Sequence, residues 1–319
     1  MGKLEKAYAG IDLGGTKILA VLVNGDGKLL GSEERPTEAA RGQDAVIATM
    51  AEMVGKLAGG QIELQSIGVA TAGTLDPADG TVELASNLGW RNVPLGKELE
   101  RLLGLQVTVD NDANAAAYGE WRAGAGVGTQ NCLFITVSTG IGGGIICDGK
   151  LMRGRSASAG ELGHITIDWN GPRCPCGNIG CLELYASGTA IGRAAASAAA
   201  ADPVRGAKLL ALAGGAAGDI TSRHVGEAAK EGDALALEVL KRAGTALGAG
   251  LVSAIHLANP EAIILGGGAS HIGEPLLGPM REALADRVIP SMGRGVKIVA
   301  PRLGAKAGAI GAALMAKAQ

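Results

Sequence analysis

Two stretches decide the fold: YAGIDLGGTKILAVLV at residues 8–23 and NCLFITVSTGIGGGIICDG at residues 131–149. Each begins with an apolar run, passes through a turn rich in glycine and hydroxyl residues, and ends in a second apolar run. Short apolar runs bounded by turn residues are typical of buried strands. Both stretches therefore predict β-hairpins.

The segments that follow the two hairpins also come in the same order. SIGVATAG (66–73) and LQVTVDNDANAAAYGEW (105–121) in the first half correspond to EAIILGGGAS (261–270) and VKIVAPRLGAKAGAIGAALMAK (296–317) in the second. This self-similarity predicts a duplicated α/β unit with both glycine turns facing one cleft. An insertion with a cysteine-rich loop and alanine-rich helices enlarges the second half.

Composition limits the classes of function. The 319 residues are 47% hydrophobic with a net charge of -2, so the chain can bury a large core and carries no basic run for nucleic acid. The apolar run at 132–147 is interrupted by glycines, which argues against a bilayer helix, and MGKLEKAYAG lacks the apolar core of a signal peptide. We expect a cytoplasmic protein with neither a membrane nor a nucleic acid as partner.

One histidine and three cysteines lie close together in GHITIDWNGPRCPCGNIGCLE, residues 163–183. Zinc selects thiolate and imidazole ligands in a tetrahedron, and the glycines Gly177 and Gly180 let a short loop wrap one ion. The alternative is a chance grouping of thiols around a histidine. Three thiolates and one imidazole would fill all four positions and leave none for activated water, so the predicted zinc is structural. Its ligands are His164, Cys174, Cys176 and Cys181.

The two glycine turns have two interpretations. They can expose backbone N–H groups and hydroxyls to a polyphosphate, with Asp12 holding Mg²⁺, or they can simply be tight hairpins. The chain contains neither G-x-x-x-x-G-K-[ST] nor a G-x-G-x-x-G after a strand. Any phosphate site is therefore of another type.

Asp112 stands where a strand is predicted to pass into a helix. An aspartate at this junction can cap the helix N-terminus, or it can act as a general base in phosphoryl transfer. The residues alone leave both roles open.

Five motifs in this order resemble the sugar kinases of the ROK family (repressor, open reading frame, kinase), and the resemblance covers nearly the whole chain. The motifs are IDLGGTK (11–17), VDNDANAAAYGE (109–120), TVSTGIGGGI (136–145), ELGH (161–164) and CPCGNIGCLE (174–183). The run ELGHITIDWNGPRCPCGNIGCLELYASG is most similar to that of bacterial glucokinases within the family. The resemblance implies two domains of the duplicated ribonuclease-H-like fold, shared with actin, hexokinase and Hsp70, that close over Mg²⁺-ATP and a hexose.

The resemblance also implies residue roles. Asp112 becomes the general base that takes the proton of the sugar hydroxyl. The sugar contacts are Gly73, Asn87, Asn111, Asp112, Glu161, His164 and Glu183. The nucleotide contacts are Asp12, Gly14, Gly15, Thr16, Lys17, Thr139, Gly140, Gly266, Gly267 and Gly268. Zinc on one ring nitrogen of His164 would leave the other free to donate to a sugar oxygen.

We expect a small domain of residues 1–109 plus 303–319 and a large domain of residues 110–302. The expected activity is ATP-dependent phosphorylation of glucose to glucose 6-phosphate, in a homo-oligomer that is a dimer or a tetramer. The alternatives are a kinase for mannose, fructose or N-acetylmannosamine, a glucokinase that uses polyphosphate, and a sugar-sensing ROK regulator. The last requires a helix-turn-helix region, and only about ten residues precede Asp12.

For several residues the sequence allows two roles. LGGGAS, which contains Gly266–Gly268, can be an adenosine contact or a turn that ends a strand. Trp90 can line the cleft or pack in the core, and Arg153 and Arg155 can steer phosphate or be solvated. Ala72 stands where many relatives have proline before Gly73, which bears on the shape of the sugar loop.

Overall fold

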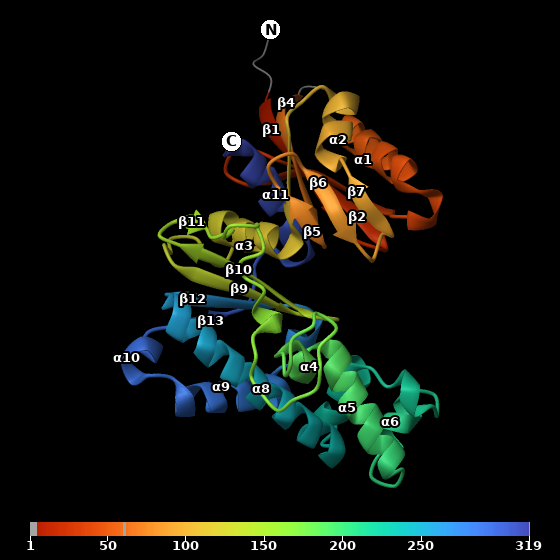
Figure 1. The fold of residues 1–319 in the computed structure, drawn as a ribbon, viewed down its shortest axis with the longest axis vertical. Coiled ribbons are helices and arrows are strands. Elements are labelled where there is room, and N and C mark those ends of the chain that lie inside the picture. Colours follow the sequence, from red (N-terminus) through yellow and green to blue (C-terminus); the bar gives the residue numbers. More distant parts are fainter. Residues whose placement is uncertain (1–4, 60–61, 319) are drawn as a thin grey trace. The chain divides into compact units, whose positions relative to one another are not determined.

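The computed structural model describes residues 5–59 and 62–318 and shows a mixed α/β chain (Figure 1). The first four residues, part of the stretch in which no signal peptide was predicted, lie outside the described ranges. The chain divides into two compact units. Unit 1 comprises Met1–Phe134, Gly144–Gly160 and Val299–Gln319, and unit 2 comprises Ile135–Gly143 and Glu161–Ile298.

Unit 1 contains a five-stranded sheet in the order β3-β2-β1-β4-β8. Its strands are β1 (Glu5–Leu13), β2 (Lys17–Val23), β3 (Leu29–Pro36), β4 (Ile62–Thr71) and β8 (Val107–Asn111). β1 pairs antiparallel with β2, as the first hairpin predicted, and parallel with β4, which pairs parallel with β8. A separate three-stranded sheet consists of β5 (Thr74–Asp76), β6 (Thr81–Ala85) and β7 (Trp90–Val93).

Helices cover both faces of the five-stranded sheet, which explains why β2 is apolar without alternation. Ile18, Ala20 and Leu22 belong to the core cluster that includes α1 (Gln43–Leu57) and α2 (Leu95–Leu103). Leu19, Val21 and Val23 instead pack against α11 (Ala307–Lys317). α3 (Asp112–Ala123) follows β8 directly and packs against α11.

α11 approaches β1 and β4 so closely at Gly10 and Gly68 that only glycine fits at these two positions. A Cβ atom on Gly10 of β1 or Gly68 of β4 would collide with the backbone carbonyls of Ala309 and Ala312. The glycines in these strands are therefore required by packing.

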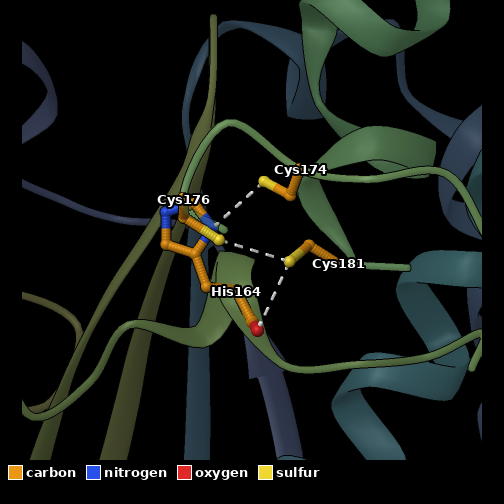
Figure 2. Close-up of side chains that lie close together, drawn as sticks. All are labelled: His164, Cys174, Cys176 and Cys181. Atoms are coloured by element: carbon orange, nitrogen blue, oxygen red, sulfur yellow. Dashed lines mark hydrogen bonds between the residues drawn. The ribbon is translucent and has the colours of Figure 1, made fainter. Parts of the chain in front are cut away.

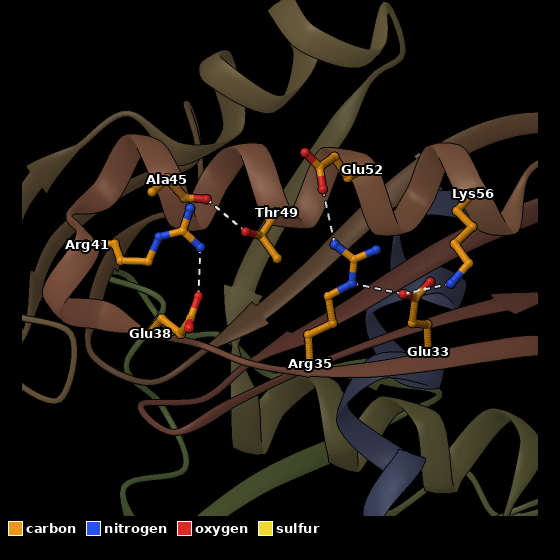
Figure 3. A network of polar contacts seen from close by, with 8 residues as sticks. All are labelled: Glu33, Arg35, Glu38, Arg41, Ala45, Thr49, Glu52 and Lys56. Carbon is orange, nitrogen blue, oxygen red and sulfur yellow. Dashed lines mark hydrogen bonds and ion pairs between the residues drawn. The ribbon is translucent and has the colours of Figure 1, made fainter.

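Charged side chains connect the edge strand β3 to α1 (Figure 3). Arg35 contacts Glu33 at 2.8 Å and Glu52 at 3.1 Å, and Lys56 contacts Glu33 at 3.1 Å. Ion pairs that water can reach contribute little to stability, because solvent screens their charges. Their charges also make β3 a poor template for pairing with another chain.

A second five-stranded sheet has the order β11-β10-β9-β12-β13. Its strands are β9 (Cys132–Val137), β10 (Ile141–Cys147), β11 (Lys150–Leu151), β12 (Ala262–Gly266) and β13 (Lys297–Val299). Numbered along the chain, the strands of this sheet follow the order 3-2-1-4-5, and those of the first sheet follow the same order. The elements predicted at residues 131–149, 261–270 and 296–317 are all present.

The helices of unit 2 arise from the alanine-rich insertion and from the segment after β12. They are α4 (Glu183–Ala186), α5 (Gly188–Ala201), α6 (Ala207–Leu212), α7 (Ser222–Lys230), α8 (Ala234–Ala258), α9 (Glu274–Arg287) and α10 (Pro290–Gly293). Short 3₁₀ turns lie at η1 (Ala39–Arg41), η2 (Leu162–His164), η3 (Ala217–Asp219), η4 (Gly268–Ile272) and η5 (Gly304–Lys306). No helix within residues 5–59 and 62–318 has both the length and the apolar character needed to cross a membrane.

Candidate active site

The carboxyl ends of three neighbouring parallel strands carry the polar residues of unit 1. In the register of the sheet, Asp12 of β1 lies beside Ala70 of β4, and Thr71 of β4 lies beside Asn111 of β8. Asp112 follows Asn111 as the first residue of α3. Parallel strands end at one edge of a sheet, and ligands of open α/β sheets bind there.

Asn111, not Asp112, is the N-cap of α3. Its side chain accepts hydrogen bonds from the backbone N–H groups of Ala113 at 2.9 Å and Asn114 at 3.2 Å. The capping role considered for Asp112 thus belongs to the residue before it. Asp112 Oδ1 also accepts a hydrogen bond from the Ala113 N–H, at 2.8 Å. The positive end of the α3 dipole therefore lies at this carboxylate.

Two carboxylates at this edge, those of Asp12 and Asp112, have raised pKa values. Burial, and then the negative charge of Asp112, raise the pKa of Asp12 from 3.8 to about 6, although Lys17 acts in the opposite direction. The side chain of Asp112 is exposed, but the protein packed around it partly desolvates the carboxylate and raises its pKa. A raised pKa makes a carboxylate a better proton acceptor near neutral pH.

Two hydrogen bonds to Gly14 hold the first glycine turn in place. The Gly14 N–H donates to the Lys17 carbonyl at 3.0 Å, and the Thr37 hydroxyl donates to the Gly14 carbonyl at 2.7 Å. Asn87, in the turn between β6 and β7, packs directly against Gly15, where a Cβ would lie 3.1 Å from the Asn87 carbonyl oxygen. The structure thus brings a predicted sugar contact to a predicted phosphate contact.

The predicted nucleotide contacts Thr16 and Lys17 are both exposed, and Lys17 is engaged elsewhere. Its ammonium pairs with Glu34 of β3 at 2.8 Å. Gly308, at the start of α11, was not predicted, yet a Cβ there would lie 2.8 Å from Asp12 Oδ2. Because Gly308 is 296 positions from Asp12, local sequence gave no signal for this contact.

The predicted sugar-loop glycine, Gly73, has no room for a side chain. Its φ of 119° lies in a region that other residues avoid, and a Cβ would collide with the Leu84 carbonyl. Ala72 before it is half-buried.

In unit 2, the second glycine turn is tied to Glu183. The Ser138 N–H donates to the Gly140 carbonyl at 2.8 Å, which closes the turn between β9 and β10. The Glu183 carboxylate accepts a hydrogen bond from the Ile141 N–H at 2.8 Å and lies against Gly140. A predicted sugar contact is thus in direct contact with a predicted phosphate contact here too.

A cavity of about 720 Å³ opens beside this turn. It is lined by residues of the β9–β10 turn, α5, the η3–α7 segment and η4. The lining residues are Ser138, Thr139, Gly188, Thr189, Gly192, Arg193, Ala196, Ser197, Gly218, Ile220, Thr221, Ser222, Gly268 and Ala269. Its volume falls in the range of small-molecule sites. The sequence predicted only Thr139 and Gly268 of this set.

The three glycines of LGGGAS have different environments. Gly268 lines the cavity, whereas Gly266 is the buried last residue of β12. Gly267 has a φ of 90°, and a Cβ there would collide with the backbone of Val137. A strand-ending turn therefore accounts for Gly266 and Gly267.

The predicted zinc ligands converge, as Figure 2 shows. One ligand atom from each of His164, Cys174, Cys176 and Cys181 lies within 4.8 Å of the others. Cys176 Sγ and Cys181 Sγ are 3.7 Å apart, and Cys174 Sγ lies 3.8 Å from His164 Nδ1. A tetrahedral zinc with Zn–S bonds of about 2.3 Å places two sulfurs about 3.8 Å apart. The donor set and its spacing fit structural zinc.

The loop geometry explains how so short a segment supplies these ligands. Gly177 and Gly180 have φ values of 98° and 65°, as their predicted role requires. Burial, and then the neighbouring cysteines, raise the pKa of the Cys181 thiol to about 12. A bound cation would reverse this effect, since zinc ligands bind as thiolates.

His164 presents Nδ1 to the cysteines, so its other nitrogen faces away from them. Nε2 lies 4.0 Å from a carboxylate oxygen of the exposed residue Glu161. Metal on Nδ1 would fix the tautomer with a proton on Nε2. The arrangement offers a ligand a donor from His164 beside an acceptor from Glu161.

Three residues left open by the sequence have clear environments. Trp90 is 4% exposed and belongs to the core of unit 1. Arg155 is exposed, as a solvated charge would be. Arg153 instead pairs with the buried carboxylate of Asp110 at 2.7 Å while its own side chain stays partly exposed, a contact that neither sequence interpretation includes.

A chain with two mixed α/β units, paired carboxylates at strand ends and a Cys₃His loop has the architecture expected of a ROK protein. The ROK family model matches residues 8–319, and the chain belongs to the ROK family. It is 40% identical over 309 residues to a glucokinase of Streptomyces coelicolor, covering 97% of this chain and 96% of that protein. It is 38% identical to a glucokinase of Thermotoga maritima, with the same coverage. The crystal structure of a ROK family glucokinase from Streptomyces griseus, in complex with glucose and AMPPNP, matches with a TM-score of 0.82 at 39% identity, covering 98% of this chain and all of that one.

Proposed function

We propose that this protein is a glucokinase that transfers the γ-phosphoryl group of ATP to glucose and releases glucose 6-phosphate and ADP. The observation that carries the proposal is Asp112, a carboxylate with a raised pKa at the start of α3. The similarity over nearly the full length of two glucokinases, and to a glucokinase structure with glucose and AMPPNP, supports the choice of substrates.

In this mechanism Asp112 accepts the proton of the sugar hydroxyl as the hydroxyl oxygen attacks the γ-phosphorus. The bond between the γ-phosphorus and its bridging oxygen breaks, and ADP leaves. Mg²⁺ bound with ATP would neutralise charge on the phosphates, and Asp12 is the residue that would hold it, directly or through water. The uncompensated carboxylate of Asp12, with its pKa of about 6, fits that task.

Sugar binding is proposed for seven residues. Asp112 is the base, five others have polar groups beside a glycine turn, the base or the metal loop, and Gly73 follows the carboxyl end of β4. The seven residues are Gly73, Asn87, Asn111, Asp112, Glu161, His164 and Glu183. Asn111 uses its carbonyl oxygen as the cap, which leaves its amide nitrogen as the donor for sugar. Zinc would hold His164 in the tautomer that donates from Nε2 and would add no catalytic step of its own.

Nucleotide binding is proposed for the two glycine turns and the cavity of unit 2. Gly14, Gly15 and Thr16, with Thr139 and Gly140, would contact the phosphates, and the 720 Å³ cavity would take the adenosine. Lys17 would first have to leave Glu34.

The duplication, the domain boundaries at 1–109 plus 303–319 and 110–302, and the homo-oligomer belong to the same proposal. The shared strand order of the two five-stranded sheets supports a duplicated ribonuclease-H-like fold. Trp169 and Leu257, which are 83% and 84% exposed, offer apolar surface for contacts between copies. Sedimentation velocity would give the oligomeric state.

A coupled assay of ADP release with purified protein, glucose and Mg²⁺-ATP tests the proposal. Mannose, fructose and N-acetylmannosamine as acceptors, and polyphosphate as donor, separate the alternative kinases. We expect the highest kcat/KM with glucose and ATP. Absence of turnover with every hexose would refute the proposal, and a preference for another sugar would correct the substrate.

A further inference from the structure

An ion pair with a buried carboxylate lies two residues before the proposed base in the chain. Asp110, on β8, is 3% exposed, and its Oδ2 accepts a hydrogen bond from Arg153 Nε at 2.7 Å. Its other oxygen, Oδ1, accepts from the Asn111 backbone N–H at 2.8 Å and from Asn114 Nδ2 at 3.1 Å. One carboxylate thus holds both the cap of α3 and a residue of its first turn, on either side of Asp112.

A carboxylate this deeply buried requires compensation. Two hydrogen bonds to Oδ1 satisfy one oxygen, and Arg153 supplies the charge and the donor for the other. The Arg153 side chain is 38% exposed and remains partly hydrated, so the cost of burying the pair falls mainly on Asp110. Removing one partner of such a pair leaves an uncompensated buried charge, which is much worse than losing an exposed pair.

The chain around Arg153 also holds the guanidinium in place. Arg153 follows the short strand β11, and its carbonyl accepts a hydrogen bond from the Ala159 N–H at 3.1 Å. This hydrogen bond closes the short loop of residues 153–159 and restrains the backbone at Arg153. Arg155, in the same loop, is exposed and shares none of these contacts among the described residues.

We propose that Arg153 is a positioning residue for phosphoryl transfer: it holds Asp110, which in turn fixes Asn111 and the first turn of α3, and hence the carboxylate of Asp112. The inference rests on the proposed function, in which Asp112 is the base. Catalytic geometry is sensitive to such support, since a displacement of about 1 Å can cost about a hundredfold in rate. Arg153 itself touches neither substrate in this proposal.

Two other roles for Arg153 make different predictions. A salt bridge that only stabilises the fold would lower the melting temperature and leave kcat and KM of the folded enzyme unchanged. An arginine that binds the phosphates of ATP would raise the KM for ATP. A positioning role predicts a fall in kcat with little change in the KM for ATP, and a smaller change in glucose affinity.

The experiment compares Arg153→Gln, Arg153→Lys and Arg155→Gln in the full-length protein. Arg155→Gln is the matched control, since it removes an equal charge from the same loop. We expect Arg153→Gln to lower kcat by roughly tenfold or more, with the KM for ATP within about twofold of wild type. Arg153→Lys keeps the positive charge but loses the planar guanidinium group, so its kcat should be about two- to fivefold lower than that of wild type. Arg155→Gln should behave as wild type.

Each variant is assayed well below its melting temperature, and glucose affinity is measured by calorimetry. If Arg153→Gln does not fold, Arg153→Lys decides, because a kcat equal to that of wild type would overturn the inference. Equal losses in Arg153→Gln and Arg155→Gln, or a rise confined to the KM for ATP, would also overturn it. A wild-type protein that phosphorylates no hexose would instead refute the proposed function, and the inference with it.

Discussion

Replacing Asp12 by asparagine should make the protein more stable and less active. The pKa of Asp12 is raised from 3.8 to about 6 in the folded protein, chiefly by burial and then by the charge of Asp112. The folded state therefore holds this proton more tightly than the unfolded state. Stability is lost as pH rises from about 4 to about 6, because the unfolded chain releases the proton first. The Asn side chain has nearly the same shape and no proton to release, so Asp12→Asn avoids this loss of stability.

The size of the effect follows from the two pKa values. A shift of this size corresponds to about 3 kcal/mol at about pH 8, where Asp12 is ionised in both states, and to about 1 kcal/mol at about pH 4.5. These figures are upper bounds, since water reaches part of the Asp12 side chain. Asp12→Asn should therefore raise the free energy of unfolding by up to about 3 kcal/mol at pH 8, and by clearly less at pH 4.5.

Urea unfolding of the wild type and of Asp12→Asn at the two pH values measures this difference. Asp26→Asn is the matched control, because Asp26 is exposed and the same exchange there should leave stability unchanged. Glucose phosphorylation by Asp12→Asn should fall strongly even though the protein is more stable. A variant that is less stable than wild type at pH 8, or a gain that does not depend on pH, would refute the reasoning.

Three further predictions concern the base, the metal loop and the cavity. Asp112→Asn should lower kcat by several orders of magnitude while glucose binding remains measurable by calorimetry; near-normal turnover would exclude Asp112 as the base. Cys176→Ser should lose zinc, measured by metal analysis, and bind glucose more weakly, whereas Cys147→Ser, at an exposed thiol outside the cluster, should do neither; wild-type affinity in a zinc-free protein would break the link between metal and sugar. Gly192→Val should raise the KM for ATP and leave glucose affinity unchanged, because Gly192 lines the cavity and a Cβ there would lie 2.9 Å from the Ile220 carbonyl oxygen; an unchanged KM would place the adenosine elsewhere.

Local patterns were enough to predict the framework. The first hairpin, the passage from β8 into α3 and the metal loop depend on neighbours within about twenty residues, so periodicity and ligand spacing reveal them. The apolar run of β2 predicted a strand without predicting its two faces. Those faces became clear only when α1 and α11, far apart in the chain, were found to cover them.

Contacts between segments that are far apart in the chain could not be predicted from local sequence patterns. The cavity takes its lining from the β9–β10 turn, α5, the η3–α7 segment and η4. Only the turn and Gly268 of η4 lie in glycine-rich stretches that indicate nucleotide binding, whereas α5 and the η3–α7 segment carry no such signal. The same limit applies to Arg153, which the local sequence does not distinguish from Arg155. Only the structure shows that one arginine reaches a buried carboxylate 43 residues away while its neighbour does not.

The three acidic residues at this edge of the first sheet differ in how their charge is balanced. Asp110 has Arg153 and two hydrogen-bond donors within the chain. Asp12 and Asp112 have no comparable cation among the described residues, since the lysine nearest in sequence, Lys17, pairs with Glu34. Burial raises the pKa of both carboxyl groups, and at Asp12 the charge of Asp112 adds to that effect. A cation supplied by the chain at either position would lower these pKa values, weakening Asp112 as a proton acceptor and competing with Mg²⁺ for Asp12. The chain thus balances the charge of Asp110, which supports the site. It leaves Asp12 available for Mg²⁺ and Asp112 available for the proton of the sugar hydroxyl.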